Sequence, residues 1–484
     1  VCSSDLGNMD EQLYCEAMTD NAYTKQPNDF TQNIGNGSYS TADSYVKQVW
    51  DGRYTGIRMC NQLLENIDRV PDLDPELKKR YIGEAKVLRA YSYYELYTKF
   101  GDIPYTTKVL SIKESMSIAR TAKATVIANV LADLDEVING NYLPTSYDAD
   151  NKGRITRWAA MAIKAKIYLF EGNWTQVKNI TSTIMTEGGF KLFGSYAGLF
   201  EIANEYNSEV ILDAQYRPTS REHQMMYVFL PPTLGGYSQL SPLQELVDSY
   251  IMLDGKTIKE TGTSFDESHP YANRDPRLKA TVMYTGNSYT LADGTEVVIN
   301  CEKGEGKDGY GVGSDCSATG YYIKKYWDNT YRATLYSGLN PILIRYADIL
   351  LMNAEAVAEL GELDKTAWDA TIKPIRDRAG FTLASALEFP EGASKDKLIE
   401  IVRNERRSEL ALEGHRHKDI IRWRIADNVL NGWCHGLKTN DVVGTDDGYV
   451  RVENRTFNAN KHYLWPIPQA ERDLNGNLEQ NPNW

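Results

Sequence analysis

The sequence predicts a mainly α-helical fold in which paired helices support an irregular, loop-rich lobe with short strands. Alanine-rich amphipathic segments containing tight turns recur at 154–185 and 342–378, and they predict the helical part. Between residues 190 and 340, glycine, proline, serine and tyrosine become frequent and short alternating runs predict the lobe. We therefore expect one compact body with three regions: 1–189, the inserted lobe 190–340 as the ligand-binding part, and 341–484.

Start and stop signals mark the first helices. Apolar residues recur at helical spacing across 50–70. Asp74 and Pro75 then supply an N-cap and a first-turn proline for a long helix that ends at Gly101. A further helix is expected across 122–138.

The two alanine-rich segments have the pattern of tetratricopeptide-type helical hairpins. In 154–185 the alanines let a second helix approach closely, and the tight turn EGNW joins the two helices. The segment 342–378 repeats this pattern with a turn at Gly361. The alternative is ordinary antiparallel helix packing without true repeats.

The stretch 397–423 combines apolar residues at helical spacing with a dense set of arginines and glutamates. We expect an amphipathic helix that ends at Gly414, followed by a second apolar and basic segment that ends at Trp423. Because arginine binds carboxylates and carbonyls bidentately, several of these side chains are expected to hold neighbouring helices and loops. The alternative is a solvated charged face.

Composition excludes some classes of partner. With 53 Lys and Arg against 66 Asp and Glu, the net charge of −13 repels phosphate backbones and anionic lipids, so nucleic-acid binding is not expected. No apolar run approaches the roughly 18 residues of a membrane span. The 32 tyrosines against 11 phenylalanines favour half-exposed surfaces that bind polar ligands.

The six cysteines are too few and too scattered for a disulfide scaffold or a zinc module. Cys301 and Cys316 bracket a glycine-rich run, and a disulfide between them would close that loop in an oxidising compartment. The alternative is two unrelated thiols.

Several patterns imitate reactive or metal sites without completing them. The G-x-G-x-x-G at 304–309 is not followed by a helix that would bind phosphate. Asp148 begins a calcium-like loop whose twelfth position is Ala159 rather than glutamate, and His415 and His417 point to different sides of a helix. No motif selects a glycosidase carboxylate pair. The chain is therefore predicted to be non-catalytic and without a cofactor, while a structural calcium ion stays open.

Six sequence blocks resemble the SusD/RagB family, in the order of that family and across nearly the whole chain. They are EAKVLRAYSYYELYTKFGDIP, GRITRWAAMAIKAKIYLFEGNW, PILIRYADILLMNAEA, IRDRAGF, RNERRSELALEGHRHKDIIRW and YLWPIPQAERDLNGNLEQNPNW. Relative to the family, the motif TDN at 19–21 comes very early, so the lipidated start and its linker are expected upstream of residue 1.

The resemblance implies a SusD-like fold and a surface glycan-binding lipoprotein of Bacteroidetes that partners a SusC-like TonB-dependent transporter. Such a protein captures oligosaccharide or polysaccharide without breaking bonds and delivers it to the transporter. It would lie on the outer face of the outer membrane, held by an N-terminal lipid anchor. Two rival functions stay open, a peptide-capturing member of the same family and an unrecognised glycoside hydrolase; a bare helical-repeat scaffold is a weaker third.

A saccharide site needs flat aromatic faces and planar polar groups. The resemblance implies an aromatic arc formed by the loop after TDN together with the inserted lobe. By residue type and region, the glycan-binding candidates are Tyr39, Asp43, Trp50, Tyr289, Trp327 and Tyr331. For each of them the alternative is a core or loop-packing role, and Trp50 in particular would anchor its helix.

Overall fold

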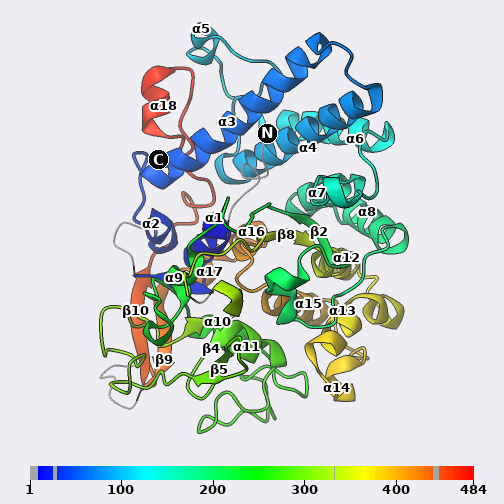
Figure 1. The fold of residues 1–484 in the computed structure, drawn as a ribbon. Coiled ribbons are helices and arrows are strands. Elements are labelled where there is room, and N and C mark those ends of the chain that lie inside the picture. The colour runs from blue at the N-terminus through cyan, green and yellow to red at the C-terminus, as the bar shows by residue number, and fades with distance from the viewer. Residues whose placement is uncertain (1–8, 26–29, 332, 440–445) are drawn as a thin grey trace.

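A computed structural model describes residues 9–25, 30–331, 333–439 and 446–484 (Figure 1). The α-helices are α1 (Met9–Tyr14), α2 (Phe30–Asn36), α3 (Ser44–Asn66), α4 (Pro75–Phe100), α5 (Ile112–Ser115), α6 (Lys123–Asn139), α7 (Arg157–Phe170), α8 (Trp174–Glu187), α9 (Met225–Phe229), α10 (Gln244–Ser249), α11 (Pro276–Thr281), α12 (Tyr346–Leu360), α13 (Lys365–Ala379), α14 (Ala384–Leu387), α15 (Lys395–Glu409), α16 (Arg416–Arg422), α17 (Ala426–Val429) and α18 (Gln469–Leu474). The strands are β1 (Ala22–Thr24), β2 (Val210–Asp213), β3 (Leu240–Pro242), β4 (Val282–Met283), β5 (Ser288–Thr290), β6 (Glu296–Val298), β7 (Tyr322–Ile323), β8 (Ile342–Arg345), β9 (Gly432–Lys438) and β10 (Tyr449–Arg455).

The long helices form one continuous row. In chain order, α3 packs on α4, α4 on α6, α6 on α7 and α7 on α8. The row continues when α8 packs on α12, which in turn contacts α13 and α15. In Figure 1 it runs from the top of the molecule down its right side. The pairs α7–α8 and α12–α13 are the two predicted hairpins, so the mainly helical fold is confirmed.

Capping residues fix where the first helices begin and end. Asp74 accepts a hydrogen bond from the Leu77 amide at 2.8 Å at the start of α4, and Gly101 ends that helix with φ +72°, as predicted. Helix α3 begins several residues earlier than the apolar spacing indicated. The reason is Asp43, whose carboxylate accepts from the amides of Tyr45 and Val46 and caps the helix at that point.

The loop-rich lobe is inserted between α8 and α12. Strand β2 near its start pairs antiparallel with β8 at its end, so both connections to the helical row lie side by side. Within the described ranges every sheet has two strands, paired as β1–β3, β2–β8, β4–β7, β5–β6 and β9–β10. The lobe has an apolar core of its own, built around residues such as Phe229, Tyr250 and Tyr322.

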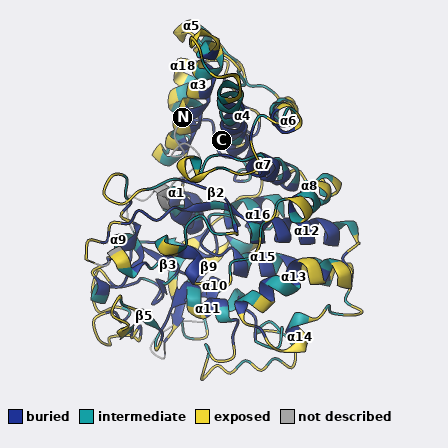
Figure 2. Cartoon of the chain, turned by 45° about the vertical axis from the view of Figure 1, so that its right-hand side comes forward, coloured by how far each residue is buried: buried dark blue, intermediate teal, exposed yellow. Residues whose placement is uncertain are grey.

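Burial follows this division. The helical row buries a second large core that includes Tyr93, Phe100 and Trp158. Figure 2 shows α12 as largely buried, while exposed residues gather on the loops around β5 and near α14. Among the helices described, none combines the length and the apolar character needed to cross a bilayer.

The charged helix α15 is shorter than predicted. It ends at Glu409 rather than at Gly414, and Leu412 adopts φ +63° in the turn that follows. The side chains of the buried residues Lys325 and Tyr326 donate to the carbonyls of Ala411 and Leu412, at 2.8 Å each. These carbonyls therefore bind partners from the lobe instead of amides of a continuing helix, a tertiary effect that local periodicity does not reveal.

Candidate functional site

Two of the predicted glycan-binding rings lie in the helical core. Tyr39 and Trp50 are each 4% exposed. The ring of Tyr39 packs against His462 and Trp484, with centroids 5.2 and 4.8 Å away, and Trp50 contacts Phe100 edge to face at 5.0 Å. Neither ring offers a free face to a ligand. This corrects the selection of both residues: the structure gives them the packing role that was the alternative.

Asp43 has a structural partner for each carboxylate oxygen. Its Oδ1 caps α3 by accepting from the amides of Tyr45 and Val46, at 3.0 and 3.4 Å. Its Oδ2 accepts from the side-chain amide of Asn33 at 3.2 Å. Helix capping therefore accounts for this side chain.

The candidates in the lobe are only partly accessible. Tyr289 is fully buried, and its hydroxyl donates to the carbonyl of Ile323 at 2.8 Å. Trp327 packs on the Tyr289 ring at 5.3 Å and remains half-buried, with its indole N–H donating to the Thr290 carbonyl at 3.0 Å. The side chain of Tyr331 lies outside the described part of the chain. The structure thus brings Tyr289 and Trp327 together, in a different core from the two N-terminal rings.

The predicted disulfide is not formed. Cys301 and Cys316 are both buried as free thiols. The Cys316 Sγ donates to the carbonyl of Lys307 at 3.3 Å, so this thiol makes a hydrogen bond within the loop. Burial also raises the pKa of the Cys301 thiol well above its ordinary value, which keeps it protonated and unreactive.

Three tyrosines that were not selected form an exposed aromatic surface on the lobe. The rings of Tyr227 and Tyr237 stack with centroids 5.9 Å apart and planes 17° apart. Tyr336 meets Tyr227 edge to face at 6.3 Å. Tyr237 is 47% exposed and Tyr336 is 39% exposed. We call Tyr227, Tyr237 and Tyr336 the tyrosine platform; such rings present apolar faces and hydroxyl groups at the same surface.

A chain reversal builds the first half of this platform. After α9 the segment PPTLGG turns the chain back, and the Tyr237 amide donates to the Tyr227 carbonyl at 2.8 Å. Gly236 is required at this turn because a Cβ there would lie 2.1 Å from the carbonyl oxygen of Leu230. The proline- and glycine-rich turn is the signal in the sequence for this pair, because a chain reversal there brings Tyr237 over Tyr227.

The third ring arrives from the end of the lobe. Ser337, next to Tyr336, exchanges two backbone hydrogen bonds with His223, both 2.9 Å. The His223 side chain is buried beside this bridge, and burial lowers its pKa to about 4, so it is neutral at physiological pH. The guanidinium of Arg221 lies over the Tyr216 ring at 4.7 Å, and that ring meets His223 edge to face at 5.1 Å.

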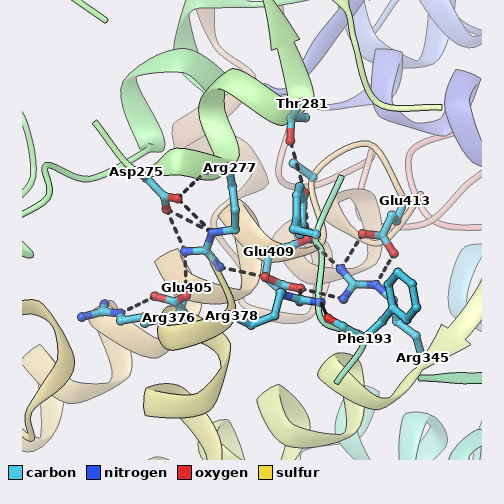
Figure 3. Close-up of polar contacts among 12 residues, drawn as sticks. Phe193, Asp275, Arg277, Thr281, Arg345, Arg376, Arg378, Glu405, Glu409 and Glu413 are labelled. Atoms are coloured by element: carbon cyan, nitrogen blue, oxygen red, sulfur yellow. Dashed lines mark hydrogen bonds and ion pairs between the residues drawn. The ribbon is translucent and has the colours of Figure 1, made fainter. Parts of the chain in front are cut away.

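Glu405 and Glu409 of α15, and Glu413 just after it, form a buried ion-pair network with arginines from other elements (Figure 3). Arg345 donates to Glu209, Glu409 and Glu413 over 2.6 to 2.8 Å. Arg277 binds Glu409 at 2.9 Å and Glu405 at 2.7 Å. Within α15 itself, Arg406 binds Asp348 at 2.6 Å and Arg407 donates to the Asp20 carbonyl at 3.0 Å. These contacts confirm the prediction that side chains of this stretch hold neighbouring elements.

The arginines of this network hold the Glu409 carboxylate ionised. Burial alone would raise the pKa of Glu409, but Arg378, Arg345 and Arg277 together hold it well below its ordinary value. A glycosidase needs one carboxylic acid that stays protonated near neutral pH. Glu409 is therefore suited to structure and not to acid catalysis.

Metal ligands do not gather in the described ranges: His, Cys, Asp and Glu side chains form no group of three or more that would hold an ion there. Asp148, where a calcium-like loop begins, instead caps a short turn by accepting from the Asn151 amide at 3.1 Å.

Comparisons with known proteins agree with this architecture. A model of the SusD family matches residues 199–484, and a second model, described as starch-binding and associating with the outer membrane, matches residues 4–169. SusD-like protein P25 of Formosa agariphila is 28% identical over 409 residues, which cover 80% of this chain and 71% of that protein.

Solved structures show the same fold. A SusD-like carbohydrate-binding protein from Bacteroides fragilis superposes with a TM-score of 0.86 at 28% identity, covering 96% of this chain and 92% of its own. A second SusD-like protein from the same species gives a TM-score of 0.84 at 26% identity, covering 100% and 95%. Because the SusD family model spans more than half of the sequence, this chain belongs to the SusD family.

Proposed function

We propose that this protein captures carbohydrate on the tyrosine platform without breaking bonds. The observation that carries the proposal is the exposed, backbone-braced group of Tyr227, Tyr237 and Tyr336. Two further facts support a saccharide ligand: the starch-binding description of the matching N-terminal model and the carbohydrate-binding description of the Bacteroides fragilis structure. The apolar face of a sugar ring stacks on phenol rings of this kind, while their hydroxyls and nearby planar groups bind sugar hydroxyls.

Affinity at such a surface comes from several stacked sugars. A ring face that covers about 50 Å² of apolar sugar surface contributes roughly 1.3 kcal/mol at 25 cal/mol per Å². Each stacked ring is therefore expected to account for about a tenfold change in affinity. Short oligosaccharides that reach only one ring should bind weakly, and longer chains more tightly.

Binding to a panel of neutral polysaccharides, measured by affinity electrophoresis and calorimetry, tests the proposal. Tyr237→Ala should weaken binding about tenfold. Tyr237→Phe keeps the ring and should retain most of the affinity. An equal loss in both variants would show that stacking is not the source of binding, and unchanged affinity in Tyr237→Ala would remove the platform from the site.

The rival functions have their own measurements. Incubation with a bound oligosaccharide should return it intact, and turnover that is lost on replacing one acidic residue would establish a hydrolase. Saturable binding from a peptide library, in the absence of binding to any glycan, would favour peptide capture instead.

We further propose that the protein delivers its ligand to a SusC-like transporter while a lipid anchor holds it at the outer surface of the outer membrane. Support for a docking surface comes from α5 and α18, which lie side by side in Figure 1. Ile112, Met116 and Leu474 are 81%, 50% and 61% exposed there, and Asn475 holds the two segments together by donating to the Ile118 carbonyl at 2.8 Å. Contiguous exposed apolar side chains are typical of protein interfaces.

Co-purification with a SusC-like transporter that is expressed together with this protein tests the partnership. The double variant Ile112→Asp and Leu474→Asp should lose the transporter and keep its glycan affinity. Retained co-purification would exclude this surface as the docking site.

A further inference from the structure

Two cavities flank helix α10, on a part of the lobe that the tyrosine platform does not include. The first measures about 640 Å³ and lies between α10, the segment 265–272 and the hairpin of β9 and β10. The second measures about 430 Å³ and lies between α10, α15 and the start of β9. Volumes in this range are typical of ligand sites in proteins.

The two cavities adjoin. Asp248 on α10 lines both of them, and the hairpin forms a wall of each, through Lys438 and Tyr449 in the first and through Trp433 in the second. His435 fastens this hairpin to α10, because its amide and Nδ1 contact the Glu245 carboxylate at 3.0 and 2.7 Å. A chain-like ligand lying along α10 would therefore pass from one cavity to the other at Asp248.

Tyrosines line the first cavity: Tyr271 and Tyr449 are partly exposed, and Tyr284 and Tyr321 are largely buried behind them. Tyr271 and Tyr284 stack with centroids 4.0 Å apart, and the hydroxyls of Tyr271 and Tyr321 lie 3.2 Å apart. The Tyr321 hydroxyl in turn donates to Gln244 on α10 at 2.6 Å. These bonds hold the rings in place before any ligand arrives, which lowers the entropic cost of binding.

The second cavity offers one large exposed ring and planar amides. Trp433 is 43% exposed. Asn404 and Asn428 line the same cavity, and the Asn404 amide is oriented by donating to the Ser249 carbonyl at 3.0 Å. Aromatic faces beside amides are the combination that binds the two kinds of surface on a sugar.

The charges of the first cavity do not favour an anion. The guanidinium of Arg274 is occupied by carbonyls, among them those of Val247 and Tyr250 at 2.6 and 2.8 Å. Lys438 pairs with Glu267 at 3.2 Å. At the junction, Oδ1 of Asp248 accepts from the Gln244 side-chain amide at 2.7 Å, and the carboxylate is an acceptor for ligand hydroxyl groups.

We propose that these two cavities form a second oligosaccharide site, the α10 groove, which binds a neutral glycan chain extended past Asp248. This inference rests on the proposed carbohydrate-binding function but concerns residues that the platform does not share. A polysaccharide held at both sites on one molecule gains effective concentration, so the groove would strengthen capture of long chains more than of short ones.

A platform-ablated protein tests the groove. The triple variant Tyr227→Ala, Tyr237→Ala, Tyr336→Ala should still be retarded by the neutral polysaccharide that the unmodified protein binds. Adding Trp433→Ala and Tyr449→Ala, one ring from each cavity, should abolish that residual binding. In the otherwise unmodified protein the same pair should weaken polysaccharide binding about tenfold, with the thermal midpoint unchanged.

Each outcome separates the two proposals. Complete loss of binding in the triple variant overturns the groove proposal and leaves the platform proposal standing. Unchanged affinity in the variant that lacks only the two groove rings has the same meaning. Groove-dependent binding of an acidic polysaccharide in preference to a neutral one overturns the assignment of ligand class. No binding of any glycan by the unmodified protein overturns both proposals. The control variant Val70→Ala, at a side chain that is 49% exposed and belongs to neither proposed site, should behave as the unmodified protein in every assay.

Discussion

Replacing Arg345 by methionine should destabilise the protein strongly. Arg345 is 1% exposed and bonds three carboxylates, those of Glu209, Glu409 and Glu413. Removing one partner of a buried ion pair typically costs about 3–5 kcal/mol, because the remaining charge stays desolvated. The unfolding entropy of a chain of this length is about 1 kcal/mol per kelvin, so the thermal midpoint should fall by roughly 3–5 °C.

The loss should also depend on pH with a definite sign. Glu409 has a pKa below its unfolded value, so its ionisation stabilises the fold above the unfolded pKa, and that contribution disappears as the pH falls. Arg345→Met removes part of the cause of this depression. The difference between variant and unmodified protein should therefore be largest near neutral pH and shrink below about pH 4, the ordinary glutamate range.

Thermal melts of the unmodified protein, Arg345→Met and a matched control measure the contribution of the buried network. The matched control is Lys178→Met, which breaks a pair with Glu362 whose side chains are 40% and 50% exposed and should cost no more than about 1 kcal/mol. If Arg345→Met and Lys178→Met lower the thermal midpoint by the same small amount, the buried network stabilises the fold no more than an exposed ion pair does. A loss that stays constant from pH 7 to the acid range would show that packing of the long side chain, and not charge, is responsible.

Three further predictions concern the hairpin, the platform and the lobe. The hydrogen bond to Glu245 raises the pKa of His435. The stability that this contact contributes should therefore be present below the unfolded pKa of about 6.5 and lost as the pH rises through the folded pKa. Thermal midpoints measured from pH 5.5 to 8.5 should show this decrease, and His435→Gln should remove it. Gly236→Ala should disrupt the turn and lower glycan affinity. The control Gly313→Ala, where an added Cβ meets open space, should change neither the affinity nor the thermal midpoint. Equal effects of the two variants would refute the steric reasoning. Trp327→Ala should change the glycan affinity by less than about twofold relative to the unmodified protein, because its ring is half-buried. A tenfold loss of affinity would show that Trp327 belongs to the glycan site.

Local signals predicted the helical row because they act over short distances. Asp74 caps a helix through an amide three residues away, and the alanine faces of 154–185 and 342–378 exclude most arrangements other than close helix packing. The end of α15 was predicted too late for the opposite reason. The carbonyls of Ala411 and Leu412, just after the helix, accept from Lys325 and Tyr326, more than eighty positions earlier in the chain. No sequence window around α15 contains that information.

The candidate binding residues were harder to predict because the exposure of a side chain depends on the tertiary structure. Tyr39 is covered by His462 and Trp484, from the opposite end of the chain, so its neighbourhood in sequence could not show that it is buried. Tyrosine suits both a core with one polar contact and a wet surface, which makes the residue type ambiguous. Tyr237 is easier to predict from the sequence, because a turn rich in proline and glycine precedes it and predicts a chain reversal.

The same buried network bears on how the lobe presents its ligand sites. Both ends of the insertion meet at the pairing of β2 with β8, and Arg345 at the end of β8 binds Glu209 on one side and Glu413 on the other. From within the lobe, Lys325 reaches the same Glu413 at 2.7 Å. Hinge motion of the lobe would have to separate these desolvated charges, at a cost of several kcal/mol. The platform and the α10 groove are therefore expected to keep a fixed geometry relative to the helices, so that a long glycan is selected by fit to preformed surfaces rather than by closure around it.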